Sequence, residues 1–162
     1  MKLLSINMKA FIETISSVDD DLGKSFLDTH TGEAIYIPSE VCLALENETL
    51  KEDTFDTWLK EFVSVAILIS EDEDNRYIKT PIIDDDFYIG KMKIYANLIS
   101  DLDLKVEVQK ALNSGEPIKR FKHILMDKES EIDKWYKYED NCVYEFVIAW
   151  LKSNAIELKY LN

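Results

Sequence analysis

A cluster of basic side chains is the part of this sequence whose residue types and spacing could bind a ligand. Four of them fall within five consecutive positions, namely Lys119, Arg120, Lys122 and His123. The chain as a whole carries a net charge of −13, so these cations are a local exception. Lysine and arginine donate charge-assisted hydrogen bonds to phosphate and carboxylate groups. The cluster indicates an anion site or a partner-docking face, while the structural alternative is a solvated face that pairs with acidic neighbours.

The segment that carries the cluster has the pattern of an amphipathic helix. At about 100° per residue, one side of residues 117–125 is apolar and consists of Ile118, Phe121, Ile124 and Leu125. The basic residues fall on the other side. Pro117 suits the first helical position, where its missing N–H would have had no partner. We therefore expect the apolar side to face the core and the cations to face water.

Aromatic residues follow the basic cluster closely, and two of them are candidate site residues. Trp135 and Tyr138 lie in the next predicted helix. Aromatic rings provide stacking platforms for nucleotide bases and other planar groups. In the anion-binding interpretation, one of these rings lies beside the cations and completes a phosphate, carboxylate or nucleotide site.

Sequence motifs of the common enzyme classes are absent. There is no Gly-x-Ser-x-Gly, P-loop, His-Glu-x-x-His or dinucleotide fingerprint. A nucleophile and base could come only from Cys42 or Cys142 with His30 or His123. Both cysteines fit better as small core residues, and His30 occupies a turn. We predict no catalytic residue and no cofactor.

Two runs of carboxylates, at 71–74 and 84–86, are the remaining chemical candidates. They could serve a carboxylate-dependent hydrolase, with or without a metal ion. Consecutive residues of a helix point in different directions, which weakens a metal site at 84–86. Acidic residues at the start of a helix are better explained as an N-cap and first turn. We therefore predict no metal site.

Composition limits the class of protein and its partners. A chain of 162 residues with 46% hydrophobic content fits one domain, residues 1–162, with one core. The excess of 32 acidic over 19 basic residues argues against binding of DNA, RNA or an anionic membrane. The first residues lack the pattern of a signal peptide, and no apolar run approaches the ~18 residues of a membrane span. With only two cysteines, a hundred positions apart, we expect a reducing, cytoplasmic location.

Hydrophobic periodicity predicts a mostly helical chain. Helices are expected over residues 8–15, 39–46, 55–70, 84–99, 102–112, 117–125 and 130–153. Two of these segments, 55–70 and 102–112, also fit a strand, although helix is favoured. Ser39 and Ser130 are expected to begin helices as capping residues. Glu139 falls within the apolar stripe of the last segment, so either that helix breaks near 138–141 or the carboxylate meets a cation.

Strand signals are fewer. Residues 24–37 predict a β-hairpin whose turn contains Gly32, with Phe26 and Ile35 or Ile37 on its buried face. Residues 76–80 predict a short strand, and the alternating tail 156–160 could add an edge strand to the same sheet. Together these elements predict an α+β fold, in which a small antiparallel sheet packs against a mostly helical C-terminal part.

Several motifs of the chain resemble those of a bacterial family known only as an uncharacterised protein family, with no activity assigned. They are Leu-Asp-Thr-His-Thr-Gly-Glu at 27–33, Arg-Tyr-Ile-Lys-Thr-Pro at 76–81, the segment 111–125, Trp-Tyr-Lys-Tyr at 135–138 and Trp-Leu at 150–151. The resemblance extends from the hairpin to Leu151. It implies helices at 55–70 and 102–112, and it implies no reaction.

Three hypotheses about function follow. A non-catalytic protein-interaction module is favoured, because the charged surfaces fit a protein partner and the enzyme motifs are absent. The alternative is a phosphate-, carboxylate- or nucleotide-binding domain that uses the basic helix. A carboxylate-dependent hydrolase is the weakest. The oligomeric state is not indicated by the sequence.

Overall fold

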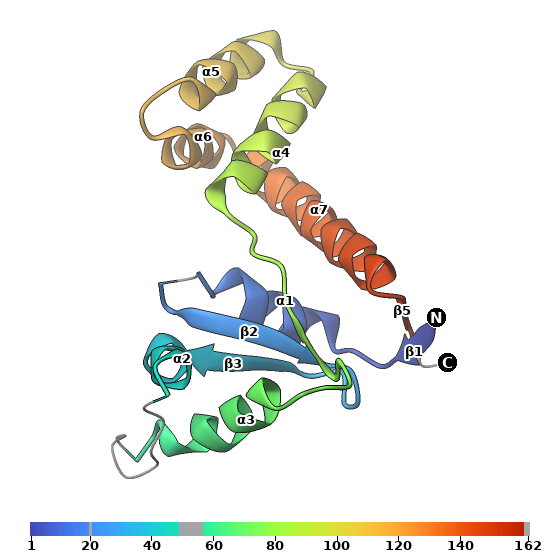
Figure 1. Ribbon diagram of the computed structural model, residues 1–162. Coiled ribbons are helices and arrows are strands. Elements are labelled where there is room, and N and C mark those ends of the chain that lie inside the picture. The colour runs from blue at the N-terminus through green and yellow to red at the C-terminus, as the bar shows by residue number, and fades with distance from the viewer. Residues whose placement is uncertain (20, 49–56, 161–162) are drawn as a thin grey trace. The chain divides into compact units, whose positions relative to one another are not determined.

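The secondary structure of this protein divides between two compact units of the chain. The computed structural model describes residues 1–19, 21–48 and 57–160 (Figure 1). Unit 1 comprises Met1–Ile82 and Ile148–Asn162, and unit 2 comprises Ile83–Val147. All strands of the described chain lie in unit 1, whereas unit 2 is entirely helical. The predicted α+β class is confirmed, and the predicted domain over residues 1–162 contains both units.

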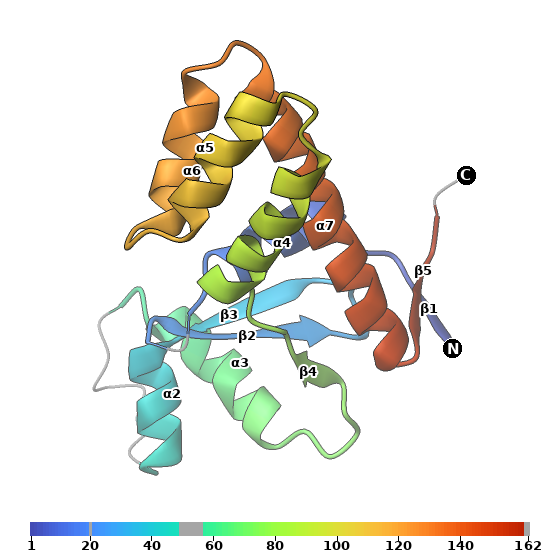
Figure 2. The ribbon, with the colours of Figure 1, turned by 90° about the horizontal axis from the view of Figure 1, so that it is seen from above.

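The main sheet of unit 1 contains the predicted hairpin. Strands β2 (Gly23–Asp28), β3 (Ala34–Pro38) and β4 (Tyr77–Lys79) form an antiparallel sheet in the order β3-β2-β4 (Figure 2). Phe26 is paired with Ile35, as the sequence predicts, and both pack against a buried cluster that includes Val41. Gly32 in the turn has a φ of 80°, and a Cβ there would collide with the Ser5 carbonyl, so only glycine fits.

Three helices accompany this sheet. They are α1 (Met8–Ser16), α2 (Ser39–Glu46) and α3 (Lys60–Ser70), and Figure 2 shows α2 and α3 beside the strands. The helical prediction for 55–70 is confirmed over the span of α3, whereas Phe55 lies outside the described residues. The expected cap at Ser39 is wrong. Pro38 occupies the N-cap position without a side-chain hydrogen bond, because β3 runs directly into the helix.

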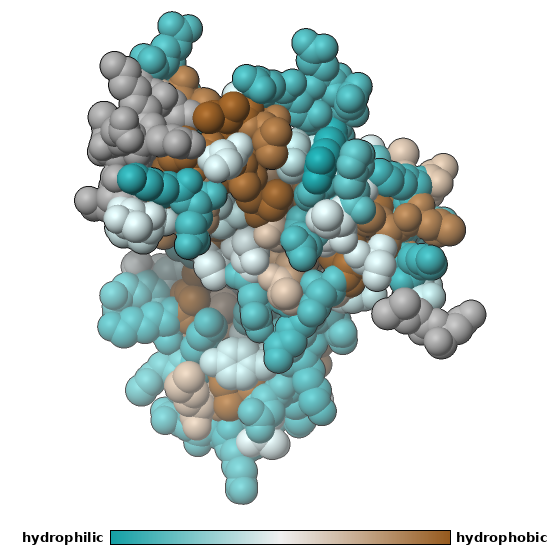
Figure 3. All heavy atoms as spheres, turned by 90° about the horizontal axis from the view of Figure 1, so that it is seen from below, coloured by the Kyte–Doolittle hydropathy of each residue, from teal (hydrophilic) through white to brown (hydrophobic). Residues whose placement is uncertain are grey.

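Helices α2 and α3 also present apolar side chains to solvent. The surface in Figure 3 includes α3, and hydrophobic residues gather there among hydrophilic ones. Leu43 of α2 and Leu68 of α3 are 56% and 53% exposed, respectively. Isolated exposed leucines are common on folded proteins, so these two alone do not define a site.

The tail of the chain does not join the hairpin sheet, which corrects the sequence prediction. Strand β5 (Ile156–Leu158) pairs in parallel with β1 (Lys2–Leu4), and the two form a separate two-stranded sheet. The sequence did not predict β1. Its three residues show no useful alternation, and their partner lies more than 150 positions away. The register brings Lys2 beside Ile156 and Leu4 beside Leu158.

Unit 2 is built from four consecutive helices that follow the predictions closely. They are α4 (Asp85–Leu98), α5 (Leu102–Leu112), α6 (Pro117–Met126) and α7 (Glu131–Ser153), the last of which continues into unit 1. Asp84 caps α4 by accepting from the Phe87 N–H at 3.0 Å, and Asp101 caps α5. Ser130 precedes α7, and its carbonyl accepts from the Lys134 N–H at 3.2 Å. It has a φ of 67°, outside the extended region that N-caps adopt.

The core of unit 2 collects the apolar sides of these helices. Its buried members are Met92, Ala96, Leu104, Val108, Leu112, Phe121, Leu125 and Trp135. Helix α7 is continuous through residues 138–141, so the possible break near Glu139 does not occur. Of the two alternatives for Glu139, only a nearby cation therefore remains.

Candidate functional site

Helix α6 is amphipathic in the sense that the sequence predicts. Phe121 and Leu125 are 0% exposed, whereas the side chains of Lys119 and His123 are 79% and 77% exposed. Arg120 is exposed and Lys122 is half-buried. The complete burial of Phe121 and Leu125 thus fixes the rotation of the helix about its own axis. The basic side chains lie on the outside because no other rotation would bury both residues.

The exposed cations of α6 have only weak acidic neighbours on the same helix or at its ends. Lys119 Nζ lies 3.9 Å from Glu116 Oε1, and His123 Nε2 lies 4.0 Å from Asp127 Oδ2. Exposed pairs of this kind contribute about 0–1 kcal/mol to stability. Within residues 1–19, 21–48 and 57–160, Arg120 makes no ion pair or side-chain hydrogen bond. These cations can therefore bind another group without breaking a strong internal contact.

Lys122 has a different environment from the other three. Its Nζ lies 5.9 Å from the centroid of the Tyr136 ring, on α7. Its charge lowers the pKa of the Glu139 carboxyl, which is also on α7, but no ion pair joins the two among the described residues. As the half-buried member of the cluster, Lys122 is the basic residue least available to a ligand.

Glu139 and Trp135 each have a buried polar atom that lacks a hydrogen-bond partner among the described residues. Burial raises the pKa of the Glu139 carboxyl, and the Asp140 charge adds to this, whereas Lys122 and the Trp135 indole act in the opposite direction. The Oε2 atom of Glu139 and the Nε1–H of Trp135 are both buried and make no hydrogen bond with the described residues. A buried polar atom without a partner costs roughly 1–3 kcal/mol.

The aromatic part of the predicted site is not on the surface. Trp135 is 0% exposed, and its ring centroid lies 5.1 Å from that of Phe121 and 5.4 Å from that of Tyr95. The role of Trp135 as a stacking platform is therefore wrong, since four helices enclose its ring. Tyr138 is half-buried, 5.1 Å from Tyr95, and burial raises the pKa of its hydroxyl.

A salt bridge in unit 1 was not foreseen from the sequence. Arg76 donates from Nε to Asp28 Oδ1 at 2.9 Å and from a terminal nitrogen to Asp28 Oδ2 at 2.8 Å. The Asp28 side chain is 6% exposed and that of Arg76 is 35% exposed. The hydrogen bonds from Arg76 lower the pKa of Asp28 to about 2, with a further contribution from the His30 N–H.

This salt bridge joins two of the family-like motifs, 27–33 and 76–81. The backbone makes the same connection, because the Thr29 N–H donates to the Arg76 carbonyl at 2.8 Å. Ser25 and Thr80 are also buried, and their hydroxyls contact each other between β2 and β4. The sequence contained both motifs, but nothing in their spacing indicated that Asp28 and Arg76 are in contact.

Two of the carboxylates considered for catalysis, Asp72 and Asp84, are used by the local backbone. Asp72 accepts from the N–H groups of Asp74, Arg76 and Tyr77, which lowers the pKa of its carboxyl. Asp84 caps α4. In the described part of the chain, no group of three or more His, Cys, Asp or Glu side chains is arranged to hold a metal ion.

The cysteines are not arranged as nucleophiles. Cys42 Sγ lies 3.5 Å from the Ile37 carbonyl, and burial raises the pKa of its thiol, which disfavours the reactive thiolate. No hydrogen bond among the described residues joins a cysteine to a histidine. Neither candidate pair from the sequence is therefore supported by a contact.

The fold and the site define an α+β protein that carries an exposed basic helix above a packed aromatic cluster. The chain belongs to the Uncharacterised protein family (UPF0158), whose model matches residues 1–161. The family predicted from the motifs is thus confirmed. The family description assigns no function.

One curated relative is a UPF0158 protein of Pseudomonas aeruginosa, 29% identical over 69 residues. The match covers 43% of this chain and 45% of that protein, so the chain matches less than half the length of this relative. No solved structure was found to match the chain. None of the helices formed by the described residues is long and apolar enough to cross a membrane.

Proposed function

We propose that this protein is a non-catalytic interaction module and that the basic face of α6 docks an acidic surface of a partner protein. This basic face consists of Lys119, Arg120 and His123. The observation that carries the proposal is their exposure on a helix whose opposite side is fully buried. In a chain with a net charge of −13, an acidic partner is attracted to this face and repelled by much of the remaining surface.

The charges of this face would increase the rate of docking and orient the partner. Exposed charges at the rim of an interface steer encounter and add modestly to affinity, and their effect falls with ionic strength. The apolar contribution would come from Met126, which is 57% exposed at the end of α6. We therefore expect fast association that slows as salt is added.

A small anion or a nucleotide is a weaker occupant for the same face. Trp135 is enclosed in the core and cannot stack on a base. Ligand sites place several donors around one concave point, whereas Lys119 and His123 extend into water and have acidic neighbours. The half-buried Lys122 is already near Glu139. These observations favour a protein surface over phosphate, carboxylate or nucleotide.

The setting that we propose is the bacterial cytoplasm. Two free cysteines and no disulfide among the described residues fit a reducing compartment. The excess of acidic residues disfavours nucleic acid as the partner, because phosphate backbones require a net cationic footprint.

The test compares partner binding by two charge-reversal variants. Lys119→Glu/Arg120→Glu changes the proposed face, and Lys93→Glu/Lys110→Glu makes the same change in net charge at exposed positions of α4 and α5. Affinity capture identifies partners of the wild type, and stopped-flow binding of the purified partner then gives association rates at several salt concentrations. We expect the α6 variant to associate at least about tenfold more slowly at low salt.

The control variant should differ from wild type by less than about threefold, since it has the same net charge. Equal slowing of both variants would mean that only the total charge matters and would reject the α6 face. Isothermal titration with inorganic phosphate and with ATP tests the alternative. Micromolar binding that the α6 variant abolishes would favour the anion-binding domain instead.

A further inference from the structure

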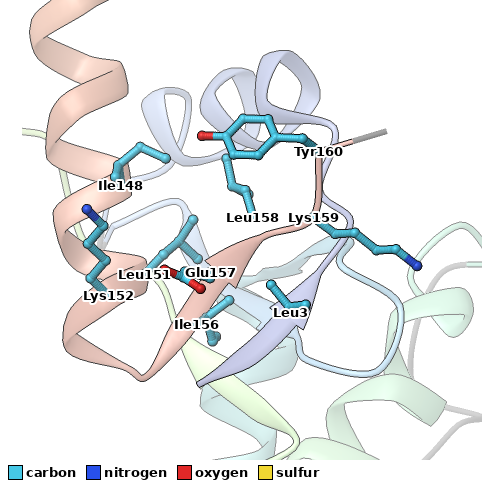
Figure 4. Close-up of a pocket in the computed structure, with 9 residues that line it drawn as sticks. All are labelled: Leu3, Ile148, Leu151, Lys152, Ile156, Glu157, Leu158, Lys159 and Tyr160. Carbon is cyan, nitrogen blue, oxygen red and sulfur yellow. The ribbon is translucent and has the colours of Figure 1, made fainter. Parts of the chain in front are cut away.

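Unit 1 presents apolar side chains to solvent in more than one place. One is a pocket of about 500 Å³, and Figure 4 shows its lining side chains around β5 and the end of α7. Its charged side chains are those of Lys152, Lys159 and Glu157, so their charges select no particular kind of partner. The outer side of α3 differs, because the charges around it are almost all of one sign.

Helix α3 is apolar around most of its circumference. Residues 62–69 are Phe-Val-Ser-Val-Ala-Ile-Leu-Ile, an apolar run with one serine. A helix that is apolar on all sides is normally buried on all sides. In α3 only Val63 and Ala66 are fully buried, and Ala66 packs in a cluster that includes Val41 of α2. The chain therefore buries one side of α3 and leaves apolar side chains on another.

The side of α3 that remains uncovered extends from Trp58 to Leu68. Trp58 lies in the turn that leads into α3 and is 57% exposed, and Leu68 is 53% exposed. Between them, Val65 is half-buried and falls on the same side of the helix as Leu68 at about 100° per residue. Hydrophobic residues gather on this part of the surface (Figure 3). Ten helical residues span about 15 Å, so this apolar strip is long enough for about three turns of a second helix.

The charged residues around this strip are almost all acidic. The residues from 57 to 74 include five carboxylates and a single lysine. Glu61 precedes Val65 by four positions and Glu71 follows Leu68 by three, and these spacings make side chains neighbours on a helix surface. Both carboxylates are exposed, and neither makes an ion pair or side-chain hydrogen bond with a residue that the structure describes. The C-terminal end of a helix also carries a partial negative charge, which no basic residue in the last turn of α3 offsets.

We infer that this side of α3 docks a basic amphipathic helix of a partner protein. The α3 face consists of Trp58, Val65 and Leu68 together with the carboxylates of Glu61 and Glu71. Apolar residues of the partner helix pack along the strip, and its lysines and arginines pair with the two carboxylates. The net charge of −13 attracts a basic partner and disfavours a second copy of this chain, which would bring the same acidic excess. The α3 face is separate from the basic face of α6 and does not rest on the function proposed for that helix.

The probe for this face is a synthetic peptide of about 18 residues, long enough to cover α3 as a helix. Leucine recurs in it at i, i+3 or i+4, and i+7, lysines flank this stripe, alanine and glutamine fill the other positions, and no aromatic residue is present. Isothermal titration gives its dissociation constant. Tryptophan fluorescence should shift to shorter wavelength on binding because Trp58 leaves water, and Trp58→Phe should abolish the shift.

Two control peptides test the chemistry of the partner. One has glutamate in place of lysine, and the other has the composition of the probe in an order without the leucine stripe. Each should bind at least about tenfold more weakly than the probe, because the first loses charge complementarity and the second loses the apolar contact.

Variants of the protein that are matched in chemistry test the place of binding. Leu68→Ser should weaken binding at least about tenfold, whereas Leu98→Ser, at a 65% exposed position of α4, should change it less than about twofold. Lys119→Gln/Arg120→Gln should not weaken binding, because the basic face of α6 takes no part in it. All these positions are exposed, so circular dichroism should show folded protein for every variant.

Charge-neutralising variants separate the α3 face from the net charge of the chain. Glu61→Gln/Glu71→Gln should weaken binding at least about fivefold, because it removes both carboxylates beside the strip. Glu13→Gln/Glu33→Gln makes the same change in net charge at other exposed positions of unit 1, and its effect should be below about twofold.

Three results would overturn the inference. If the probe does not bind, or binds Leu68→Ser as tightly as the wild type, the α3 face is not a docking site. If the two glutamate variants weaken binding equally, the peptide responds only to total charge. If light scattering shows a dimer that forms without peptide and that Leu68→Ser dissociates, the occupant is a second copy of this chain.

Discussion

The carboxylates of Asp28 and Glu139 are both removed from water in part, but they differ in how completely their oxygens are paired. In unit 1, Asp28 is held by two hydrogen bonds from Arg76 and one from the His30 N–H, and its pKa falls to about 2. In unit 2, Glu139 has a buried oxygen without a hydrogen bond, and its pKa is raised. Both have a cation nearby, so charge alone does not explain the difference.

The difference lies in geometry. The planar guanidinium of Arg76 matches both carboxylate oxygens and can hold them while remaining partly in water. Lys122 is a flexible point charge that is half-buried and also lies near the Tyr136 ring, so it does not compensate fully for the burial of Glu139. Folding therefore favours the ionised form of Asp28, whereas it shifts Glu139 toward the neutral form relative to the unfolded chain.

The largest effect is expected from breaking the pair in unit 1. Asp28→Asn keeps the shape but removes the charge and leaves Arg76 without its bidentate acceptor. Breaking a buried pair costs about 3–5 kcal/mol, and the partial exposure of Arg76 reduces this to about 2 kcal/mol. Urea unfolding gives the change in free energy. Amide exchange at Thr29 and Thr80 shows whether the connection between β2 and β4 is the part that weakens.

Glu33→Gln serves as the matched control, because Glu33 is an exposed carboxylate of the same hairpin turn. It should change the free energy of unfolding by less than about 0.5 kcal/mol. An equally large loss in both variants would show that the total charge of the turn matters and not the contact with Arg76.

The pH dependence of the two units should have opposite signs. The pKa of Asp28 is depressed from 3.8 to about 2, so its contribution is present at neutral pH and is lost as pH falls from about 5 toward 2. The pKa of Glu139 is raised from 4.5, so the folded state binds its proton more tightly. Its stabilising contribution is present below pH 4.5 and is lost as pH rises through the folded pKa.

Residue-specific amide exchange between about pH 2.5 and 7 can separate these two effects. After correction for the intrinsic exchange rate, amides in the β2–β4 pair should lose protection in acid, whereas those near Trp135 in α7 should gain it. Glu139→Gln should remove the second trend and leave the first. It should also stabilise unit 2 at pH 7 by about 0.5 kcal/mol, allowing for solvent screening. A common pH profile for both units would contradict the comparison.

The two carboxylates also show which features could be predicted from the sequence. The hairpin at Gly32, the cap at Asp84 and the two faces of α6 depend on residues within about one helical turn of each other. For Glu139, the apolar stripe predicted either a break in the helix or a nearby cation, and it did not decide between them or identify the cation. Features that depend on residues close together in the sequence can therefore be predicted from the local pattern.

Other features depend on contacts that the local pattern does not contain. Asp28 and Arg76 are 48 positions apart, and the partner of β1 is at the other end of the chain. Trp135 occupies a helical position that serves equally for the core or for a surface stacking site. Only the approach of Phe121 and Tyr95 from two other helices decides that its ring is buried.

The role of Lys122 in the comparison can be tested by removing its charge. Lys122→Met keeps most of the aliphatic stem and should raise the pKa of Glu139 further, since the Lys122 charge lowers it. A carboxyl carbon titration by NMR gives this pKa directly. Lys119→Met is the matched control, because Lys119 is on the same helix and contacts Glu116 instead. An unchanged Glu139 titration in Lys122→Met would mean that the two charges are independent.

The smallest change in stability is expected from the basic face of α6. Lys119→Glu/Arg120→Glu should alter the free energy of unfolding by less than about 0.5 kcal/mol, because both side chains are exposed and only Lys119 has a weak pair. Thermal and urea unfolding check this value. The contrast with Asp28→Asn then separates residues that hold the fold from residues available to a partner. A loss above about 1 kcal/mol would assign these cations to the fold and remove the support for α6 as a docking face.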